Sequence, residues 1–166
     1  MTVTQVATYS GLDADDAVAL STYRYQVFVE HLGWELPQQE VGRERDQFDG
    51  QDTVYAWARD SHGSICGCAR LLPTTGAYLL EQVFPQLLDG ASPPHAADVW
   101  ELSRYTTERV DGGSDSIDAA QERFRELLLA VVLAAMQRGA KRLITFSYVG
   151  VERIARRFGL HVHRVG

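Results

Sequence analysis

Apolar residues recur at helical spacing in two long segments of the chain. Between residues 118 and 138 they form one stripe, which predicts an amphipathic helix: Phe124, Leu127, Leu128, Val131, Val132 and Ala135. A second helix is predicted over residues 14–31, with Asp13 as its N-cap and with Val18, Tyr25 and Phe28 among its buried positions. Two shorter helices are expected, one within residues 78–88 that ends near Pro85 and one over 151–158 that is closed by Gly159.

Strand patterns lie between these helices. Residues 53–60 and 64–72 predict a hairpin around Ser61-His62-Gly63, and further strands are expected at 97–107, 141–148 and 160–165. Residues 33–52 are polar and without period, which is typical of a long functional loop. This order predicts a single α/β domain over residues 1–166, with helices flanking a mixed, twisted sheet. It resembles the N-acetyltransferase fold more than a doubly wound nucleotide-binding fold.

Composition narrows the class of protein. The 166 residues can bury a core and form a cleft. No apolar run approaches the roughly 20 residues of a membrane span, and the N-terminus lacks a basic, apolar signal. We therefore expect a cytoplasmic protein without a membrane span. Cys66 and Cys68 lie two apart on a predicted strand, which places both on one face and favours buried, reduced thiols over a disulfide.

Charge is distributed unevenly along the chain. Residues 1–137 hold nine basic and 21 acidic side chains, whereas residues 138–166 hold seven basic side chains against Glu152 alone. A basic end on an acidic protein favours the docking of an anionic partner, although a solvated basic helix face explains it equally well. Nucleic acid is not an expected partner, because the rest of the surface would repel it.

Several common catalytic and nucleotide-binding motifs are absent from the sequence. No Walker loop, no dinucleotide-binding GxGxxG and no GxSxG elbow follows a predicted strand. The five histidines do not have the spacing of a metal site, so no metal is predicted.

One predicted strand carries an unusual sequence, Trp100-Glu101-Leu102-Ser103-Arg104-Tyr105. Charged side chains are rarely buried without partners, so an acid and an arginine in an interior strand indicate a site. Regular alternation would place Glu101 and Arg104 on opposite faces.

These residues resemble a known family when they are taken with other short motifs. The motifs, in chain order, are Tyr23-Arg24-Tyr25-Gln26-Val27-Phe28, Gly33-Trp34, Asp46-Gln47-Phe48-Asp49, Arg70-Leu71-Leu72-Pro73, Phe84 and Glu101-Leu102-Ser103-Arg104. Together they are similar to the bacterial acyl-homoserine-lactone (autoinducer) synthases, and the likeness covers nearly the whole chain.

The resemblance implies an enzyme of quorum sensing with two substrates and no cofactor. S-adenosylmethionine supplies an amine that attacks an acyl thioester on acyl carrier protein, and its carboxylate then closes a lactone and expels methylthioadenosine. The implied residues for S-adenosylmethionine are Arg24, Phe28, Trp34, Asp46, Asp49, Arg70 and Arg104. Acids can offset the cations of this substrate, arginines can hold its carboxylate or pin the acids, and the aromatic rings can face adenine or the sulfonium. Glu101 is the expected general base, and backbone N–H groups near Ser103 can stabilise the oxyanion.

The resemblance also implies sites for the acyl donor. Phe84, Trp100, Leu102, Thr145, Phe146 and Val149 are expected to form the acyl pocket, and Thr145 hints weakly at 3-oxo chains. Arg153, Arg156 and Arg157 are expected to dock the acidic carrier, with Lys141 and Arg142 as secondary contacts. Because the reaction needs Glu101 and Arg104 near one substrate, we predict a β-bulge between residues 101 and 106. This bulge would part the strand from residues 141–148 and open a cleft where these two central strands splay.

Two alternatives remain open. The first is an acyl-coenzyme A N-acyltransferase of the same fold, since Arg109-Val110-Asp111-Gly112-Gly113-Ser114 nearly matches a pyrophosphate loop. Acidic residues at 111, 115 and 118 would repel a pyrophosphate there. The second is a non-catalytic binder of a small amphiphile, which would not need the acids at 46, 49 and 101. The family usually continues past residue 166, so we also expect a missing C-terminal segment.

Overall fold

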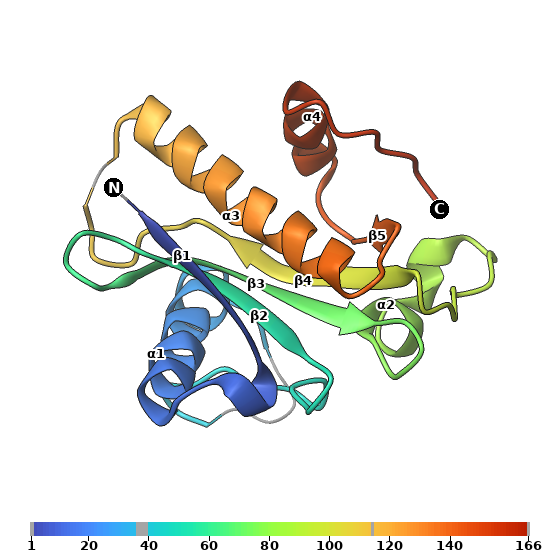
Figure 1. The fold of residues 1–166 in the computed structure, drawn as a ribbon, viewed down its shortest axis with the longest axis horizontal. Coiled ribbons are helices and arrows are strands. Elements are labelled where there is room, and N and C mark those ends of the chain that lie inside the picture. The colour runs from blue at the N-terminus through green and yellow to red at the C-terminus, as the bar shows by residue number, and fades with distance from the viewer. Residues whose placement is uncertain (1, 36–39, 114, 166) are drawn as a thin grey trace.

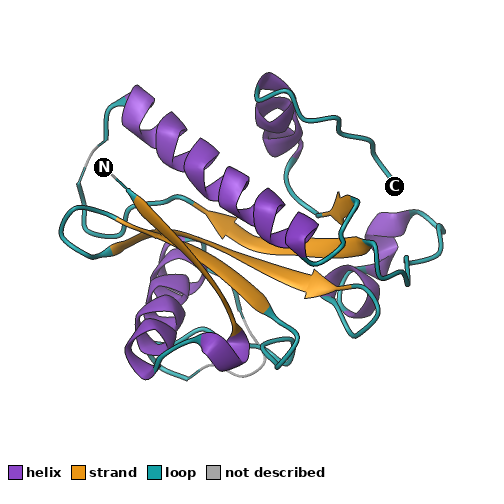
Figure 2. Ribbon diagram, in the orientation of Figure 1, coloured by secondary structure: helices purple, strands orange, loops and turns teal. Residues whose placement is uncertain are grey.

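One five-stranded sheet organises the protein (Figures 1 and 2). The computed structural model describes residues 2–35, 40–113 and 115–165. The strands follow chain order across the sheet: β1 (Val3–Thr8), β2 (Val54–Arg59), β3 (Ile65–Pro73), β4 (Val99–Thr106) and β5 (Arg142–Ile144). The first four pair antiparallel, and β5 pairs parallel with β4, so the sheet is mixed.

Helices cover both faces of this sheet. On one face lies α1 (Ala14–Arg24), which continues as a π-helix (Tyr25–His31). On the other lies α3 (Ile117–Gln137), which crosses the sheet in Figure 1. Helix α2 (Leu79–Gln82) and a 3₁₀ turn (Pro85–Leu88) follow β3, while α4 (Val149–Arg157) follows β5. A 3₁₀ turn (Tyr9–Gly11) precedes α1.

Successive side chains of a strand point to opposite faces of the sheet, so each strand contributes to the hydrophobic cores on both faces. Along β2, Val54 and Ala56 pack with α3, whereas Tyr55 and Trp57 pack with α1 and the π-helix. Every one of these side chains is buried, so β2 is a near-continuous apolar run. A third cluster gathers around α2 and includes Phe48, Leu72 and Tyr78.

Most of the predicted elements are confirmed. The hairpin, the helix over 118–138, the Asp13 N-cap and the Gly159 helix end are all present, and Asp13 accepts a hydrogen bond from the Asp16 N–H. Both cysteines are free and buried, as expected. The described part of residues 33–52 contains no helix or regular strand.

Other predictions are wrong. Strand β1 was not expected, β5 ends at Ile144 instead of residue 148, and residues 160–165 form no strand. Val18 is 42% exposed, because the buried face of α1 runs through Leu20 and Tyr23 and a residue two positions away points elsewhere. The predicted helix over 14–31 is regular only to Arg24.

The predicted bulge in β4 is present. Arg70 pairs with Ser103 and Cys68 with Thr106, so two steps along β3 correspond to three steps along β4. Arg104 lies in the bulge with a φ of +55°, a conformation that residues other than glycine rarely adopt. Trp100 and Leu102 face α3, as alternation requires, but the bulge turns Arg104 to the face of Glu101 and Ser103.

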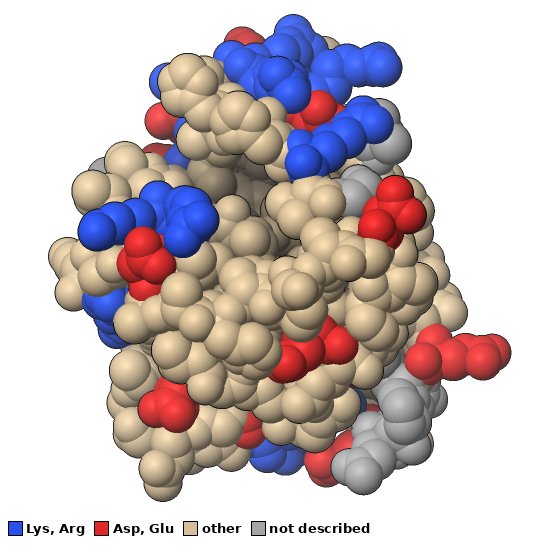
Figure 3. Space-filling model, turned by 90° about the vertical axis from the view of Figure 1, so that its right-hand side faces the viewer, with Lys and Arg blue, Asp and Glu red and all other residues tan. Residues whose placement is uncertain are grey.

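Strand β4 and the edge strand β5 separate next to the bulge. Pairing between β4 and β5 covers only Val99–Glu101 and Arg142–Ile144, while β4 continues to Thr106. The splay expected from the sequence is therefore confirmed, and Figure 3 shows a hollow on this side of the molecule. Among the described residues, no helix is both long and apolar enough to cross a bilayer.

Candidate active site

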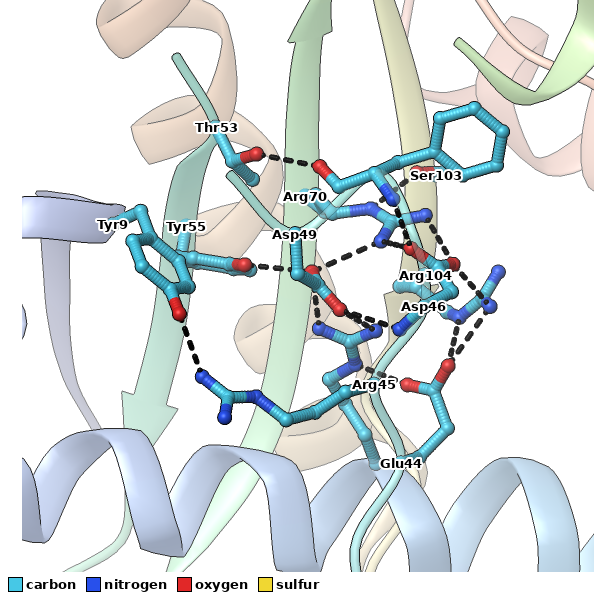
Figure 4. A network of polar contacts seen from close by, with 12 residues as sticks. Tyr9, Glu44, Arg45, Asp46, Asp49, Thr53, Tyr55, Arg70, Ser103 and Arg104 are labelled. Carbon is cyan, nitrogen blue, oxygen red and sulfur yellow. Dashed lines mark hydrogen bonds and ion pairs between the residues drawn. The ribbon is translucent and has the colours of Figure 1, made fainter. Parts of the chain in front are cut away.

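A closed ring of buried ion pairs lies on the α1 face of the sheet (Figure 4). Arg24 binds Glu44 and Asp49, Arg104 binds Glu44 and Asp46, and Arg70 binds Asp46 and Asp49. Three guanidinium groups thus alternate with three carboxylates, and the ring is neutral as a whole. We refer to these six side chains as the charge ring.

Four separate segments supply the charge ring. Arg24 ends α1, Arg70 lies in β3, Arg104 lies in the β4 bulge, and the acids come from the loop before β2. This loop is shaped by its own acids, because Asp49 accepts from the Asp46 N–H at 2.9 Å and Asp46 accepts from the Phe48 N–H at 3.0 Å. The sequence left two roles open for the arginines, holding the substrate carboxylate or pinning the acids, and in the structure they bind both aspartates.

Two of the six ion pairs in the charge ring are bidentate, and all six side chains are largely buried. Arg70 donates to both oxygens of Asp46 at 2.6 and 3.0 Å, and its Nε donates to the Ser103 hydroxyl at 3.1 Å. Arg24 donates to both oxygens of Asp49 at 2.9 and 3.1 Å. Planar fork geometry of this kind orients each group as well as neutralising it.

The arginines of the charge ring lower the pKa of two of its acids, Asp49 and Glu44. Burial alone would raise the pKa of Asp49, but the Arg24 and Arg70 guanidinium groups lower it well below its usual range. Burial likewise opposes the ionisation of Glu44, yet Arg24 and Arg104 lower its pKa. All three guanidinium groups therefore face ionised partners.

Arg104 also lies against two aromatic rings. Its guanidinium carbon is 5.5 Å from the Phe28 ring centroid and 5.0 Å from that of Trp34, and the two rings are 4.7 Å apart. The sequence suggested that these rings face the substrate. In the structure they contact Arg104, a cation–π arrangement that fixes the inner wall of the site.

Glu101 is fully buried outside the charge ring. Its carboxylate accepts from the backbone N–H groups of Leu79 at 3.2 Å and Leu80 at 2.7 Å, at the start of α2. Burial raises the pKa of Glu101, although the Leu80 and Leu79 N–H groups and the charges of Arg70 and Arg104 oppose the shift. A carboxylate with a raised pKa is a stronger base than an exposed one.

Sequence reasoning missed two residues of this site. Glu44 is 1% exposed and bridges Arg24 to Arg104, and Tyr55 donates from its hydroxyl to Asp49 at 2.6 Å. A charge count could have found Glu44, because three buried arginines need a third acid beside Asp46 and Asp49. Nothing in the sequence marks Tyr55, which looks like an ordinary aromatic strand residue.

The residues predicted for the acyl pocket do not form one cluster. Trp100 and Leu102 pack with α3, whereas Phe84 and Phe146 contact each other near α2, with ring centroids 4.7 Å apart. Thr145 is exposed after β5, and the side chain of Val149 lies outside the described part of the structure. Their role in acyl binding stays a prediction.

The basic residues predicted for carrier docking are all exposed: Lys141, Arg142, Arg153, Arg156 and Arg157. Figure 3 shows Lys and Arg side chains gathered above the hollow, at the height of α4 in Figure 1. By contrast, Arg109 in the loop after β4 is bound to acids, at 3.3 Å from Asp60 and 3.6 Å from Asp115. Ser116 caps the N-terminus of α3 by accepting from the Ala119 N–H.

Comparison with known proteins identifies the family. The family model of the autoinducer synthases matches residues 10–166. The chain belongs to the autoinducer synthase family. An acyl-homoserine-lactone synthase of Ralstonia solanacearum is 50% identical over 157 residues, which cover 94% of this chain and 74% of the relative. The protein is therefore an acyl-homoserine-lactone synthase, and its reaction is an acyl transfer.

Solved structures agree with the fold and the family. TofI, crystallised in a ternary complex with an inhibitor and MTA, superposes with a TM-score of 0.83 at 46% identity, covering 100% of this chain and 82% of TofI. BjaI is a CoA-dependent acyl-homoserine lactone synthase whose structure was solved with SAM and isopentyl-CoA. It superposes with a TM-score of 0.84 at 26% identity, covering 100% of this chain and 76% of BjaI. An acyl-CoA N-acyltransferase from Pseudomonas aeruginosa shares the fold alone. It superposes with a TM-score of 0.59 at 16% identity, covering 96% of this chain and 88% of the acyltransferase.

Proposed function

We propose that the synthase acylates the amine of S-adenosylmethionine with an acyl group from acyl carrier protein. Closure of the methionine carboxylate onto its own γ-carbon then yields the lactone and releases methylthioadenosine. The observation that carries this proposal is the position of Glu101, a buried carboxylate beside the fixed charge ring. The SAM bound in the BjaI structure and the MTA bound in the TofI structure support the choice of co-substrate.

Glu101 is the proposed base. The amine must lose a proton before it can attack, and a carboxylate with a raised pKa accepts that proton directly or through one water. The new bond joins the amine nitrogen to the thioester carbon, and the thiolate of the carrier leaves. Charge on the thioester oxygen develops at the β4 bulge, where backbone N–H groups near Ser103 are the proposed donors.

The charge ring has a different proposed role. Its arginines and acids neutralise one another, so they do not provide spare counter-ions for the substrate. Instead, they form a rigid floor of fixed dipoles under the sulfonium and carboxylate of S-adenosylmethionine. Preorganised charges of this kind need no rearrangement during the reaction.

Acyl carrier protein is the proposed donor because exposed basic side chains are gathered at one end of the molecule. Carrier proteins are acidic, and the exposed basic residues lie on and around α4. The runner-up donor is acyl-coenzyme A, which BjaI uses. Its pyrophosphate would have to approach Arg109, which Asp60, Asp111 and Asp115 already neutralise. Since the carrier is an intracellular protein, we also propose a cytoplasmic location.

One experiment tests both parts of the proposal. Release of methylthioadenosine is measured with matched acyl-carrier and acyl-coenzyme A donors, for the wild type and for Glu101→Gln. We expect kcat/KM to be at least tenfold higher with the carrier, and Glu101→Gln to lower kcat by about 100-fold or more, the usual contribution of a general base. A preference for coenzyme A would overturn the choice of donor, and an active Glu101→Gln variant would overturn the choice of base.

A further inference from the structure

Helix α2 is a single turn, yet it holds the most deeply buried acid of the site. The Leu79 and Leu80 N–H groups both donate to the Glu101 carboxylate, and Glu101 is 0% exposed. No side chain among the described residues donates a hydrogen bond to this carboxylate. The position of α2 therefore decides how Glu101 is oriented.

A four-residue helix needs outside support, because short helices are marginal in water. That support comes from the segment at residues 94–96, which we call the strap. The Tyr78 hydroxyl donates to the Pro94 carbonyl at 2.9 Å, and His95 Nε2 lies 2.8 Å from Glu81 Oε1. Tyr78 and Glu81 are the N-cap residue and a first-turn residue of α2, so the strap binds this helix at two points.

The strap is itself fixed to the end of β3. His95 Nδ1 lies 3.1 Å from the Thr74 carbonyl oxygen, and the Thr74 hydroxyl donates to the Ala96 carbonyl at 3.0 Å. The imidazole therefore links Glu81 on α2 to the Thr74 carbonyl at the end of β3. The Tyr78 ring lies edge-on to the imidazole, with ring centroids 6.2 Å apart.

We propose that His95 and Glu81 are positioning residues, which hold Glu101 in its reactive orientation by fixing α2 through the strap. This inference rests on the proposed role of Glu101 as the base. Neither residue touches the substrate in this account. Their removal loosens α2, the Leu79 and Leu80 N–H groups move away, and the carboxylate loses the donors that stabilise its ionised form.

The direction in which the pKa of Glu101 changes distinguishes this positioning role from a simple loss of stability. Because the Leu80 and Leu79 N–H groups lower the pKa of Glu101 against the effect of burial, their departure raises that pKa further. The acid limb of the pH–rate profile must then move to higher pH. A variant that is only less stable would lose activity equally at every pH.

The test compares Glu81→Gln and His95→Ala with Glu122→Gln, which removes an acid from an exposed pair with Arg125 on α3. The pKa of Glu101 is followed by ¹³C NMR of labelled glutamate carboxyls, assigned by comparison with Glu101→Gln. Steady-state kinetics are measured from pH 5 to 9 by methylthioadenosine release. Glu81→Gln keeps the shape of the side chain, so it remains informative if His95→Ala does not fold.

We expect both variants to raise the pKa of Glu101 by up to about one unit, equivalent to about tenfold in its ionisation constant. Turnover on the acid limb of the profile should fall by a similar factor, with the KM for S-adenosylmethionine unchanged. An unshifted carboxyl titration together with an unshifted acid limb would overturn the proposal. If Glu101→Gln is active, the base assignment fails, but the NMR titration still decides whether the strap controls Glu101.

Discussion

At the scale of single residues, the charge ring is a buried structure in which every member has two partners. Removing one member leaves uncompensated charge, which costs far more than the pair contributes. Most of its members could be predicted, because the arginines and aspartates fall in short motifs of a known family. Glu44 could not be found that way, because it lies between two surface-like arginines and its burial depends on Arg24 and Arg104 arriving from distant segments.

Glu44→Gln should therefore destabilise the protein. The substitution keeps the shape of the side chain but leaves Arg24 and Arg104 with one acid fewer between them. We expect the free energy of unfolding in urea to fall by about 3–5 kcal/mol. The matched control is Glu152→Gln, which also loses contacts to two arginines but on the surface of α4, and which should leave the unfolding curve unchanged. Equal losses in the two variants would contradict this account.

The charge ring also predicts the stability of the protein in acid. Asp49 and Glu44 have lowered pKa values in the folded state, so the unfolded chain binds more protons below about pH 4, where ordinary carboxylates titrate. The contribution of these two acids to the free energy of unfolding should be constant above that pH and fall as the pH decreases further. Asp49→Asn should be less stable at pH 7 and show a shallower decline. A decline of unchanged steepness in Asp49→Asn would assign the acid sensitivity to other groups.

At the scale of elements, the sequence predicted the bulge in β4, but it missed the edge strand β1 and extended the edge strand β5 to residue 148 instead of Ile144. The bulge could be inferred because two charged residues had to share one face. Strand β1 was missed because it is an edge strand whose residues are mostly half-exposed, so its apolar alternation is weak. Strand β5 is short because β4 turns away at the bulge, and residues 145–148 then have no neighbour with which to pair.

The close approach of β3 to its neighbours gives a prediction at this scale. A Cβ at Gly67 would lie 3.2 Å from the Thr106 carbonyl oxygen and 3.3 Å from Leu127 Cδ2 of α3. Gly67→Ala should lower the free energy of unfolding by about 1–3 kcal/mol, the usual cost of overpacking. Gly50→Ala is the control, since its Cβ would meet nothing within 4 Å, and thermal unfolding should show little change. Equal melting temperatures for the two variants would contradict the close packing.

At the scale of the whole molecule, charge is separated along the chain and in space. The acidic body would repel an acidic carrier, while the exposed basic residues on and around α4 would attract it. This separation was visible in the sequence, because seven of the 16 basic residues fall after residue 137. The sequence did not show that these basic residues lie above the hollow, because their position depends on how α4 follows the splayed strand β5.

Reversal of charge at Arg153, Arg156 and Arg157 should weaken the encounter with the carrier. We expect the KM for acyl carrier protein to rise by about tenfold or more at low salt, with a smaller effect at 0.5 M salt where surface charges are screened. The KM for S-adenosylmethionine should stay unchanged. Reversal at Arg43 and Arg125, which lie away from α4, is the control, and the two sets are compared by the change per reversed charge. If both sets change the carrier KM equally, net charge explains the effect and docking on α4 does not.

The charge ring has a consequence for how the protein folds. It joins residue 24 to residue 104 through the loop at residues 44–49, so none of its ion pairs is local in sequence. Contacts that close long stretches of chain form late, after the hairpin of β2 and β3 and helix α3 have provided a scaffold. The active site should therefore be among the last parts to assemble, with φ-values near zero for Glu44 and Asp49. Substitutions in the charge ring would then speed unfolding and leave the refolding rate almost unchanged.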